Sequence, residues 1–356
     1  MVQTKVSLTL MLLVLIAAPC FAKRARAGTP AWTKRLGHRM LQIEAADPGR
    51  LGLYVKDLSN GEEFSFRAKE YWYIASGVKL PIAVEVLRQA EQGNLSLSEK
   101  LNLESSDYVD GAGLMNHLPP GSRVSVETLM REMLIHSDNT ASDLLIRRVG
   151  LGRINDLVTS RWPGGFGRIT TLLDVRRNAL AGLHPATARL NNLDFLNFKS
   201  AKDDDARMRL LLRVLNLNRS DLRVRTLDGS YSAYYSKRLN SAKLTAYARL
   251  LEDLVEGRVL GPERTKYLLN TLAKVETGQN RVKAGLPAGF IFAHKTGTQR
   301  GRICDFGIIW NRRNPSIQRV VVAACTRDFS SKRRAENALR RIGEAVSQSG
   351  LFRRES

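Results

Sequence analysis

Residues 73–87, YIASGVKLPIAVEVL, place Ser76 three residues before Lys79 at the start of an apolar, helix-like run. A serine hydroxyl is a poor nucleophile until a nearby base accepts its proton, and side chains three residues apart lie on the same face of a helix. The spacing therefore suits nucleophilic catalysis. However, 25 Ser and 16 Lys among 356 residues give about one such pair by chance, so the pair alone does not establish an active site.

Two further triplets are candidates for the same chemistry. Ser-Asp-Asn occupies positions 137–139, and Lys-Thr-Gly occupies positions 295–297 in a strand-like setting. Each has a structural alternative, because Ser-Asp-Asn is also typical of a helix N-cap and Lys-Thr-Gly of a strand that ends in a bulge. From the composition, each triplet has a chance expectation of about 0.06. All three motifs in this order indicate a catalytic constellation.

The three motifs resemble those of the class A β-lactamase and penicillin-recognising serine hydrolase family. Two longer stretches, TGQNRVKAGLPAGFIFAHKTGT at 277–298 and DGAGLMNHLPPGS at 110–122, also look like family sequence, and the resemblance covers about 31–185 and 240–347. It implies an α/β (α+β) fold, in which terminal helices flank an antiparallel five-stranded sheet and an all-helical domain is inserted. The active site would lie in the cleft between these two parts.

By this resemblance Ser76 is the nucleophile and Lys79 is its general base. Ser137 would relay a proton to the leaving nitrogen, and Asn139 would orient Lys79 and the substrate amide. A lysine is neutral at ordinary pH only when burial and neighbouring cations lower its pKa. Lys295, brought in on a strand, would be such a neighbour of Lys79.

The same resemblance implies a substrate-binding strand. Lys295 would attract a substrate carboxylate, Thr296 and Thr298 would hold it, and Gly297 belongs to the same motif. The backbone N–H groups of Ser76 and Thr298 would form the oxyanion hole that stabilises the reacting carbonyl oxygen. We expect no cofactor and no metal, because no His, Cys, Asp or Glu residues show metal-ligand spacing.

The glutamate that frees the acylated serine in the lactamases is missing. In that family a loop after Ser-Asp-Asn carries Glu-x-x-Leu-Asn, and its glutamate activates the hydrolytic water. The corresponding stretch here, GFGRITTLLDVRRNALAGLHP at 165–185, contains no glutamate. One alignment, which we favour, places Arg177 at the glutamate position, and arginine cannot act as a base. The other matches Asp174 and Asn178 to the motif and makes Asp174 a candidate base with a shorter side chain.

The rest of the chain must supply the elements that position these residues. Periodicity and turn signals predict helices at 31–45 and 332–347, a hairpin of 51–57 and 62–67, and strands at 290–294, 302–310 and 318–326. Between them, 76–275 is mostly helical. We therefore assign 31–70 and 285–350 to an α/β half and 71–284 to a helical half.

Residues at about 186–239 exceed the length that the family usually allows. Their charge-rich part, 199–225, contains six arginines: Arg207, Arg209, Arg213, Arg219, Arg223 and Arg225. They could shape a rim over the cleft or bind an anionic polymer. We favour a solvated helical decoration, because a run of charges is normally a solvated surface.

Two cysteines of the predicted sheet face each other. A hairpin symmetric about position 314.5 puts Cys304 directly opposite Cys325. Directly opposed Cβ atoms lie about 4.5–5.5 Å apart, slightly wide for a disulfide. The sequence therefore favours two reduced, buried cysteines.

The N-terminus predicts export. Residues 1–22 contain Lys5, an apolar run from Leu8 to Ala18, and small residues at the two positions that determine cleavage after Ala22. The run is too short to span a bilayer, and Pro19 disfavours lipid attachment at Cys20. We expect a periplasmic or secreted monomer without a transmembrane span.

The chain is strongly basic. Its 56 Lys and Arg residues against 34 Asp and Glu give a formal net charge of +22. Nucleic-acid binding is disfavoured, because an exported protein rarely meets nucleic acid and no binding motif occurs. Electrostatic contact with anionic envelope polymers fits the charge better.

Three functions are compatible with this pattern. The favoured one is an exported serine hydrolase that opens β-lactam amides through an acyl-serine intermediate. The second is a penicillin-binding-like D-alanyl peptidase or esterase with slow β-lactam turnover, which the missing glutamate favours. The third is an inactive module that binds cell-wall fragments, against which the intact Ser76, Lys79, Ser137 and Lys295 argue.

Overall fold

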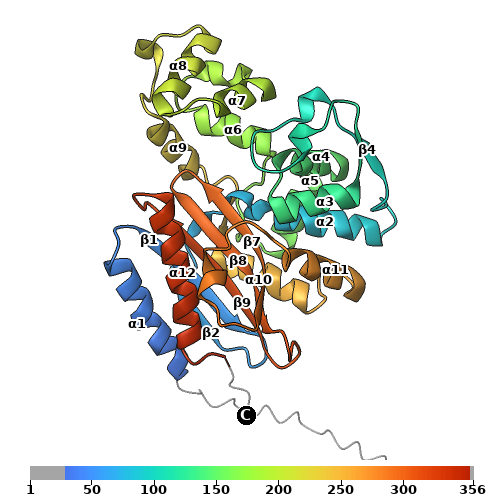
Figure 1. The fold of residues 1–356 in the computed structure, drawn as a ribbon, viewed down its shortest axis with the longest axis vertical. Helices are drawn as coiled ribbons and strands as arrows, with labels where there is room; N and C mark the ends of the chain where they lie inside the picture. Colours follow the sequence, from blue (N-terminus) through green and yellow to red (C-terminus); the bar gives the residue numbers. More distant parts are fainter. Residues whose placement is uncertain (1–28, 353–356) are drawn as a thin grey trace, which may run out of the picture.

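A computed structural model describes residues 29–352 of the chain. Its centre is a five-stranded antiparallel sheet with the strand order β2-β1-β9-β8-β7 (Figure 1). The strands are β1 (Arg50–Asp57), β2 (Glu63–Phe66), β7 (Phe290–Gln299), β8 (Arg302–Asn311) and β9 (Arg319–Arg327). Strands from both ends of the chain therefore form one sheet, as the sequence predicts.

Two terminal helices cover one face of this sheet (Figure 1). They are α1 (Ala31–Ala45) and α12 (Lys332–Gln348), close to the predicted 31–45 and 332–347. The apolar side of α1 is buried at Trp32, Leu36, Met40 and Ile43. These side chains pack with α12 and the sheet into a single apolar core, which fixes the sheet as a rigid support.

The middle of the chain covers the opposite face with helices and two short two-stranded sheets, β3 with β6 and β4 with β5. The strands are β3 (Tyr71–Tyr73), β4 (Lys100–Asn102), β5 (Arg123–Ser125) and β6 (Ser241–Lys243). The helices are α2 (Lys79–Glu91), α3 (Val126–Arg131), α4 (Asn139–Val149), α5 (Leu151–Arg161), α6 (Leu172–Leu180), α10 (Leu244–Val255) and α11 (Pro262–Leu272). Helix α2 is buried on almost every side, which fixes the position of its N-terminus.

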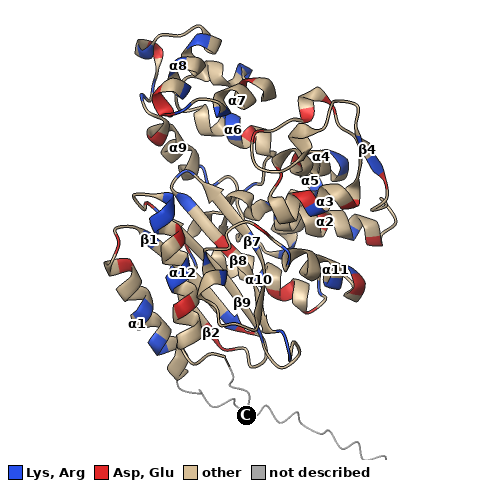
Figure 2. Ribbon diagram, in the orientation of Figure 1, with Lys and Arg blue, Asp and Glu red and all other residues tan. Residues whose placement is uncertain are grey.

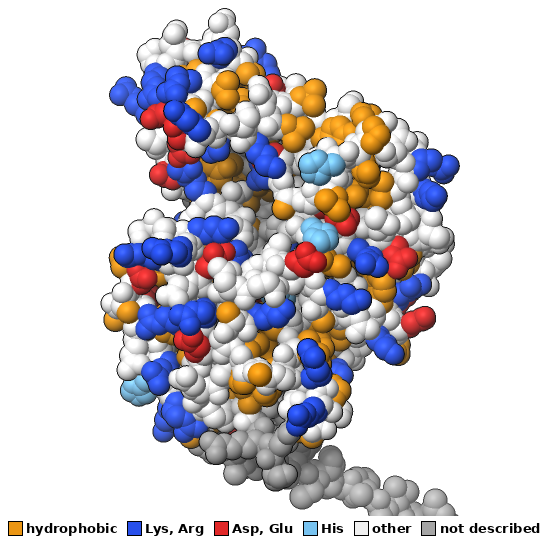
Figure 3. Space-filling model, in the orientation of Figure 1, with side chains coloured by type: hydrophobic (Ala, Val, Ile, Leu, Met, Phe, Trp, Pro, Cys, Tyr) orange, Lys and Arg blue, Asp and Glu red, His pale blue; other side chains and the backbone are white. Residues whose placement is uncertain are grey.

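Residues 186–239, called the lobe below, form a third body at the top of Figure 1. The lobe contains α7 (Asn192–Lys199), α8 (Asp204–Leu215) and α9 (Leu227–Ser236). It has a small apolar core that includes Phe195, Phe198, Leu211 and Leu215. Figure 3 shows Lys and Arg side chains gathered on one side of it and a hollow where it meets the rest of the molecule.

The lobe is helical and most of its arginines are exposed, as expected of a solvated decoration, but it is also docked to the rest of the molecule. The side-chain amide of Asn192 donates to the Ser105 carbonyl at 2.6 Å, and Lys199 Nζ donates to the Gly111 carbonyl at 2.9 Å. Arg300, in the β7–β8 turn, pairs with Asp204 and Asp228 of the lobe. Charges that look solvated in the sequence therefore attach the lobe to the body.

The two cysteines form a disulfide, so the expectation of reduced cysteines is wrong. Cys304 on β8 lies directly opposite Cys325 on β9, as the hairpin symmetry predicts. Their Cα atoms are only 4.1 Å apart, somewhat less than the roughly 4.5 Å of an opposed pair without hydrogen bonds. The prediction of reduced cysteines assumed that the two residues are slightly too far apart for a disulfide, and the two strands are closer here than that prediction assumed.

Lys and Arg residues are spread over both parts of the fold, with Asp and Glu among them (Figure 2). Among residues 29–352, no helix combines the length and the apolarity needed to cross a membrane. The predicted signal peptide at 1–22, with Cys20, lies outside the described residues.

Candidate active site

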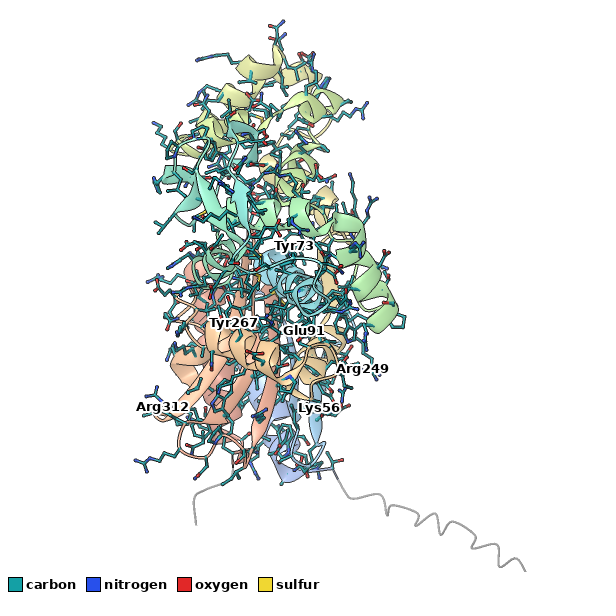
Figure 4. All side chains as sticks on the ribbon, turned by 90° about the vertical axis from the view of Figure 1, so that its right-hand side faces the viewer. Lys56, Tyr73, Glu91, Arg249, Tyr267 and Arg312 are labelled. Atoms are coloured by element: carbon teal, nitrogen blue, oxygen red, sulfur yellow. A yellow bond between two sulfur atoms is a disulfide. The ribbon has the colours of Figure 1, made fainter. Side chains whose placement is uncertain are left out.

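The local backbone presents Ser76 at a sharp bend. Strand β3 leads through Ala75, which has a left-handed φ of 47°, into a 3₁₀ turn at Ala75–Val78 that continues as α2. A left-handed alanine costs about 1 kcal/mol. Tyr73, labelled near the middle of Figure 4, lies at the end of β3 just before this bend. Within residues 29–352 the Ser76 hydroxyl makes no hydrogen bond to other side chains, and Ser76 is half-buried rather than sealed in the core.

Lys79 lies at the first position of α2 and is completely buried. Its Nζ donates to the Ser137 carbonyl at 2.5 Å, to Asn139 Oδ1 at 2.7 Å and to Ser137 Oγ at 3.2 Å. The Asn139 amide in turn donates to the carbonyl of Asp110 at 2.7 Å. The structure therefore joins Lys79 to both polar residues of the Ser-Asp-Asn motif.

The structural alternative for Ser-Asp-Asn is also partly correct, but at a different residue. Asp138 is the N-cap of α4, and its carboxylate accepts hydrogen bonds from the backbone N–H groups of Ala141 and Met115 at 2.8 and 3.0 Å. Ser137 precedes it with a left-handed φ of 63°. Because Asp138 caps the helix, the Ser137 hydroxyl is left for the site.

Lys295 reaches the same hydroxyl from the sheet. It is fully buried on β7, and its Nζ donates to Ser137 Oγ at 3.1 Å and to the Thr296 carbonyl at 3.2 Å. The neighbouring Gly297 allows this strand to approach, because a Cβ there would lie 2.1 Å from the Ile74 carbonyl oxygen. Two lysines from different elements thus converge on Ser137, and Lys79 lies one helical turn from Ser76, the predicted nucleophile.

The surroundings of Lys79 and Lys295 disfavour a positive charge on both amines at once. Burial, followed by the nearby Lys295 charge, lowers the pKa of Lys79 well below its usual value, although Asp138 and Asp143 oppose this shift. Burial and the Arg281 charge lower the pKa of Lys295 to about 7. Both shifts favour the neutral amine, the form that a general base requires.

Arg281 is a site residue that sequence reasoning missed. It is buried, and its guanidinium donates to Thr298 Oγ1 at 2.6 Å and to the carbonyls of Gly297 and Cys304 at 3.2 and 3.1 Å. Glu336 of α12 pairs with it at 3.0 Å. Arg281 lies within the family-like stretch 277–298, which is the sequence feature that could have identified it. The spacing of the motifs alone gave no reason to select this arginine. It fixes Thr298 and the end of β7.

Thr296 has a different partner from Thr298. Its hydroxyl lies 2.6 Å from the hydroxyl of Thr277, in the loop before β7. The Lys-Thr-Gly strand is thus held by side chains from the preceding loop along its length. The structure brings Ser137, Asn139, Lys79 and Lys295 into one network, while the two threonines lie beside it on β7.

Asp174 is placed differently. It lies in the first turn of α6, its side chain is 41% exposed, and it pairs with Arg177 at 3.4 Å. Arg177 also donates to the Leu190 carbonyl at 2.9 Å, and the Asn178 amide donates to the Asp174 carbonyl at 2.9 Å. In the described part of the chain, no hydrogen bond or ion pair links Asp174 to Ser76, Lys79 or Ser137.

Asp143 is a second carboxylate that the sequence reading overlooked. It accepts hydrogen bonds from the backbone N–H groups of Leu172 and Leu173 at 2.7 and 2.9 Å, so it fastens the start of α6 to α4. Burial raises the pKa of Asp143 to about 6. An aspartate four residues after Asn139 looks like an ordinary helical residue, which is why it gave no signal.

Most of the chain is similar to known proteins. Residues 35–349 match the beta-lactamase enzyme family. The chain belongs to that family. A beta-lactamase of Mycobacterium tuberculosis is similar, at 24% identity over 84% of this chain and 82% of that protein.

Solved structures agree in fold. The beta-lactamase from Sphaerobacter thermophilus is 23% identical, with a TM-score of 0.65 over 90% of this chain and 99% of that one. A mutant of PBP-A, solved as an acyl-enzyme complex with penicillin G, is 20% identical, with a TM-score of 0.65 over 89% of this chain and 96% of that one. Family and fold together support a hydrolase of the beta-lactamase type.

For this beta-lactamase family member we predict a bell-shaped pH profile of kcat/KM for acylation. The rate should rise as Lys79, the predicted base, loses its proton. It should fall above pH 7 as Lys295, with a pKa of about 7, loses the charge that we expect to attract a substrate carboxylate. Lys295→Arg keeps a positive charge throughout this range and should remove the falling limb. A falling limb that is unchanged in this variant would contradict the assignment.

Proposed function

We propose that this protein is an exported serine hydrolase that opens β-lactam amides through an acyl intermediate on Ser76. The observation that carries the proposal is the convergence of the Lys79 and Lys295 side-chain amines on Ser137 Oγ, at 3.2 and 3.1 Å, beside the turn that holds Ser76. Placing two amines in the protein interior costs several kcal/mol per charge. An arrangement with that cost is expected where the amines do chemistry.

Each residue has a defined role in the proposed reaction. Neutral Lys79 accepts the Ser76 proton as the hydroxyl attacks the lactam carbonyl. Ser137 touches both amines and relays a proton to the leaving nitrogen as the amide bond breaks. The N–H groups of Ser76 and Thr298 hold the developing oxyanion, with about 3 kcal/mol from each donor.

The substrate is held on two sides in this proposal. Lys295 attracts its carboxylate, and Thr296 and Thr298 donate hydrogen bonds to it; Arg281, 2.6 Å from Thr298 Oγ1, positions that hydroxyl. Asn139 orients the substrate amide from the opposite wall while it accepts a hydrogen bond from Lys79 at 2.7 Å. No cofactor takes part.

A second candidate is a D-alanyl peptidase or esterase of the same fold that turns β-lactams over slowly. It is favoured by one observation, the absence of glutamate from 165–185 together with the pairing of Asp174 to Arg177 instead of the lysine network. An inactive cell-wall-binding module is the least favoured, because simple binding does not require Lys79 and Lys295 to be buried.

We also propose that the mature protein is a periplasmic or secreted monomer. Its support is the signal-like sequence at 1–22, with cleavage near Ala22. Lipid attachment at Cys20 is less favoured, because Pro19 precedes it. The charge of +22 suits contact with anionic envelope polymers and gives no reason to invoke nucleic acid.

Time-resolved mass spectrometry of the intact mature protein mixed with benzylpenicillin tests the proposed function. We expect an adduct on Ser76 that forms and then disappears as hydrolysed penicillin accumulates. Ser76→Ala should give no adduct while it keeps the native thermal transition. A persistent adduct would select the peptidase alternative, and no adduct on the folded wild type would overturn β-lactam acylation.

Asp174→Asn tests the candidate deacylating base separately. If Asp174 activates the hydrolytic water, acylation should continue while deacylation slows about 100-fold or more, which traps the acyl-enzyme. Asp156→Asn, at an exposed position of α5, is the matched control and should deacylate like the wild type. Unchanged turnover of Asp174→Asn would exclude the role.

A further inference from the structure

A cavity of about 210 Å³ lies between the lobe and the candidate active site. Helices α6, α7, α8 and α9, the loop at 110 and the end of β7 enclose it. Its apolar wall comes mainly from the lobe. Its polar wall is formed by Asp110, Arg176, Lys199, Arg207, Tyr231 and Gln299. The cavity therefore exists because the lobe is docked.

Three residues of the cavity wall are neighbours of the candidate site. Asp110 accepts a hydrogen bond from the Asn139 amide at 2.7 Å through its carbonyl. Gln299 directly follows Thr298 on β7. Tyr231 packs against the cluster of Tyr73 and Ala75, the residues that lead into Ser76. The cavity wall thus contains direct neighbours of Asn139, of Thr298 and of the segment that leads into Ser76.

Positive charge exceeds negative charge in the cavity wall. Arg176 is neutralised by Asp110, whose carboxylate and carbonyl it contacts. The amine of Lys199 has a neutral partner, the Gly111 carbonyl at 2.9 Å, and within residues 29–352 it pairs with no carboxylate. Arg207 pairs with Asp204 at 3.2 Å, but Asp204 also forms an ion pair with Arg300. Three cations against one lining carboxylate leave a site suited to an anion.

We propose that this cavity receives a carboxylate on the acyl side chain of the substrate, with Lys199 and Arg207 as its binding residues. In the proposed reaction Asn139 orients the substrate amide, and the Asn139 side chain is hydrogen-bonded to Asp110 in the cavity wall. The acyl side chain, which is attached to that amide, therefore begins next to the cavity. The substrate's other carboxylate goes to Lys295 and Thr298. The lobe then gives the enzyme a preference for substrates that carry a second carboxylate, on the acyl side chain. This inference rests on the proposed acylation of Ser76.

Benzylpenicillin and its α-carboxy derivative test the inference, because they differ only by a carboxylate on the acyl side chain. We expect the wild type to be acylated faster by the carboxy compound than by the neutral one, by about fivefold in the second-order rate constant. Lys199→Met should reduce that ratio to about one. Arg207→Gln, a second variant on a different helix, should also lower it.

Lys202→Met is the control for overall charge. Lys202 is an exposed lobe residue three positions from Lys199, so its loss changes the net charge equally. It should leave the ratio at its wild-type value. An equal fall in both lysine variants would mean general attraction of anions by the basic protein and would overturn the inference.

Failure of the carboxylate site and failure of the proposed function give different results. If both penicillins acylate wild-type Ser76 at equal rates, the carboxylate site is wrong and the proposed function stands. If neither acylates it, the proposed function is wrong and the inference falls with it.

Discussion

Two buried lysine amines share one serine hydroxyl, and this constraint shapes the whole site. Lys79 approaches Ser137 Oγ from α2 and Lys295 from β7, within 3.2 and 3.1 Å. Burial lowers the pKa of both amines, and a neighbouring positive charge lowers each further: Lys295 acts on Lys79, and Arg281 acts on Lys295. The arrangement requires β7 to lie against the turn that holds the nucleophile, which the glycine of the Lys-Thr-Gly motif permits. The pKa of Lys79, the proposed base, thus depends on Lys295, which lies on a different element of the fold.

The lobe is docked beside the candidate site by contacts to several parts of the body. Its apolar core also includes Leu180 and Leu183 of the body, and the lobe is further attached through hydrogen bonds to the loop at 105–111 and ion pairs to Arg300. Its α9 places aromatic rings beside Tyr73, with ring centroids 4.8 Å apart for Tyr73 and Tyr235. The lobe therefore contacts the segment that leads into Ser76 as well as the loop at 105–111.

Much of the fold could be predicted from the sequence, because the motifs and strand periodicity are local signals. The strands at both ends and the opposition of Cys304 and Cys325 follow from alternation and hairpin symmetry. The disulfide could not be predicted, because only a small difference in strand separation distinguishes a bonded pair from two thiols. Arg281 and Asp143 act through contacts distant in sequence, with Thr298 and with the start of α6. The docking of the lobe was missed for a similar reason: paired and solvated charges look alike in a sequence.

The most direct measurement of the central claim is the protonation of Lys79 in the free protein. Carbon-13 labelled lysine, observed by NMR across a pH titration, reports each ε-carbon separately, and a Lys79→Met sample identifies the signal. The account predicts that Lys79 titrates well below the ordinary lysine value of about 10.4. Lys295→Met should move this pKa upward, because it removes the nearby positive charge. A Lys79 that titrates near the ordinary value in the folded protein would contradict the account.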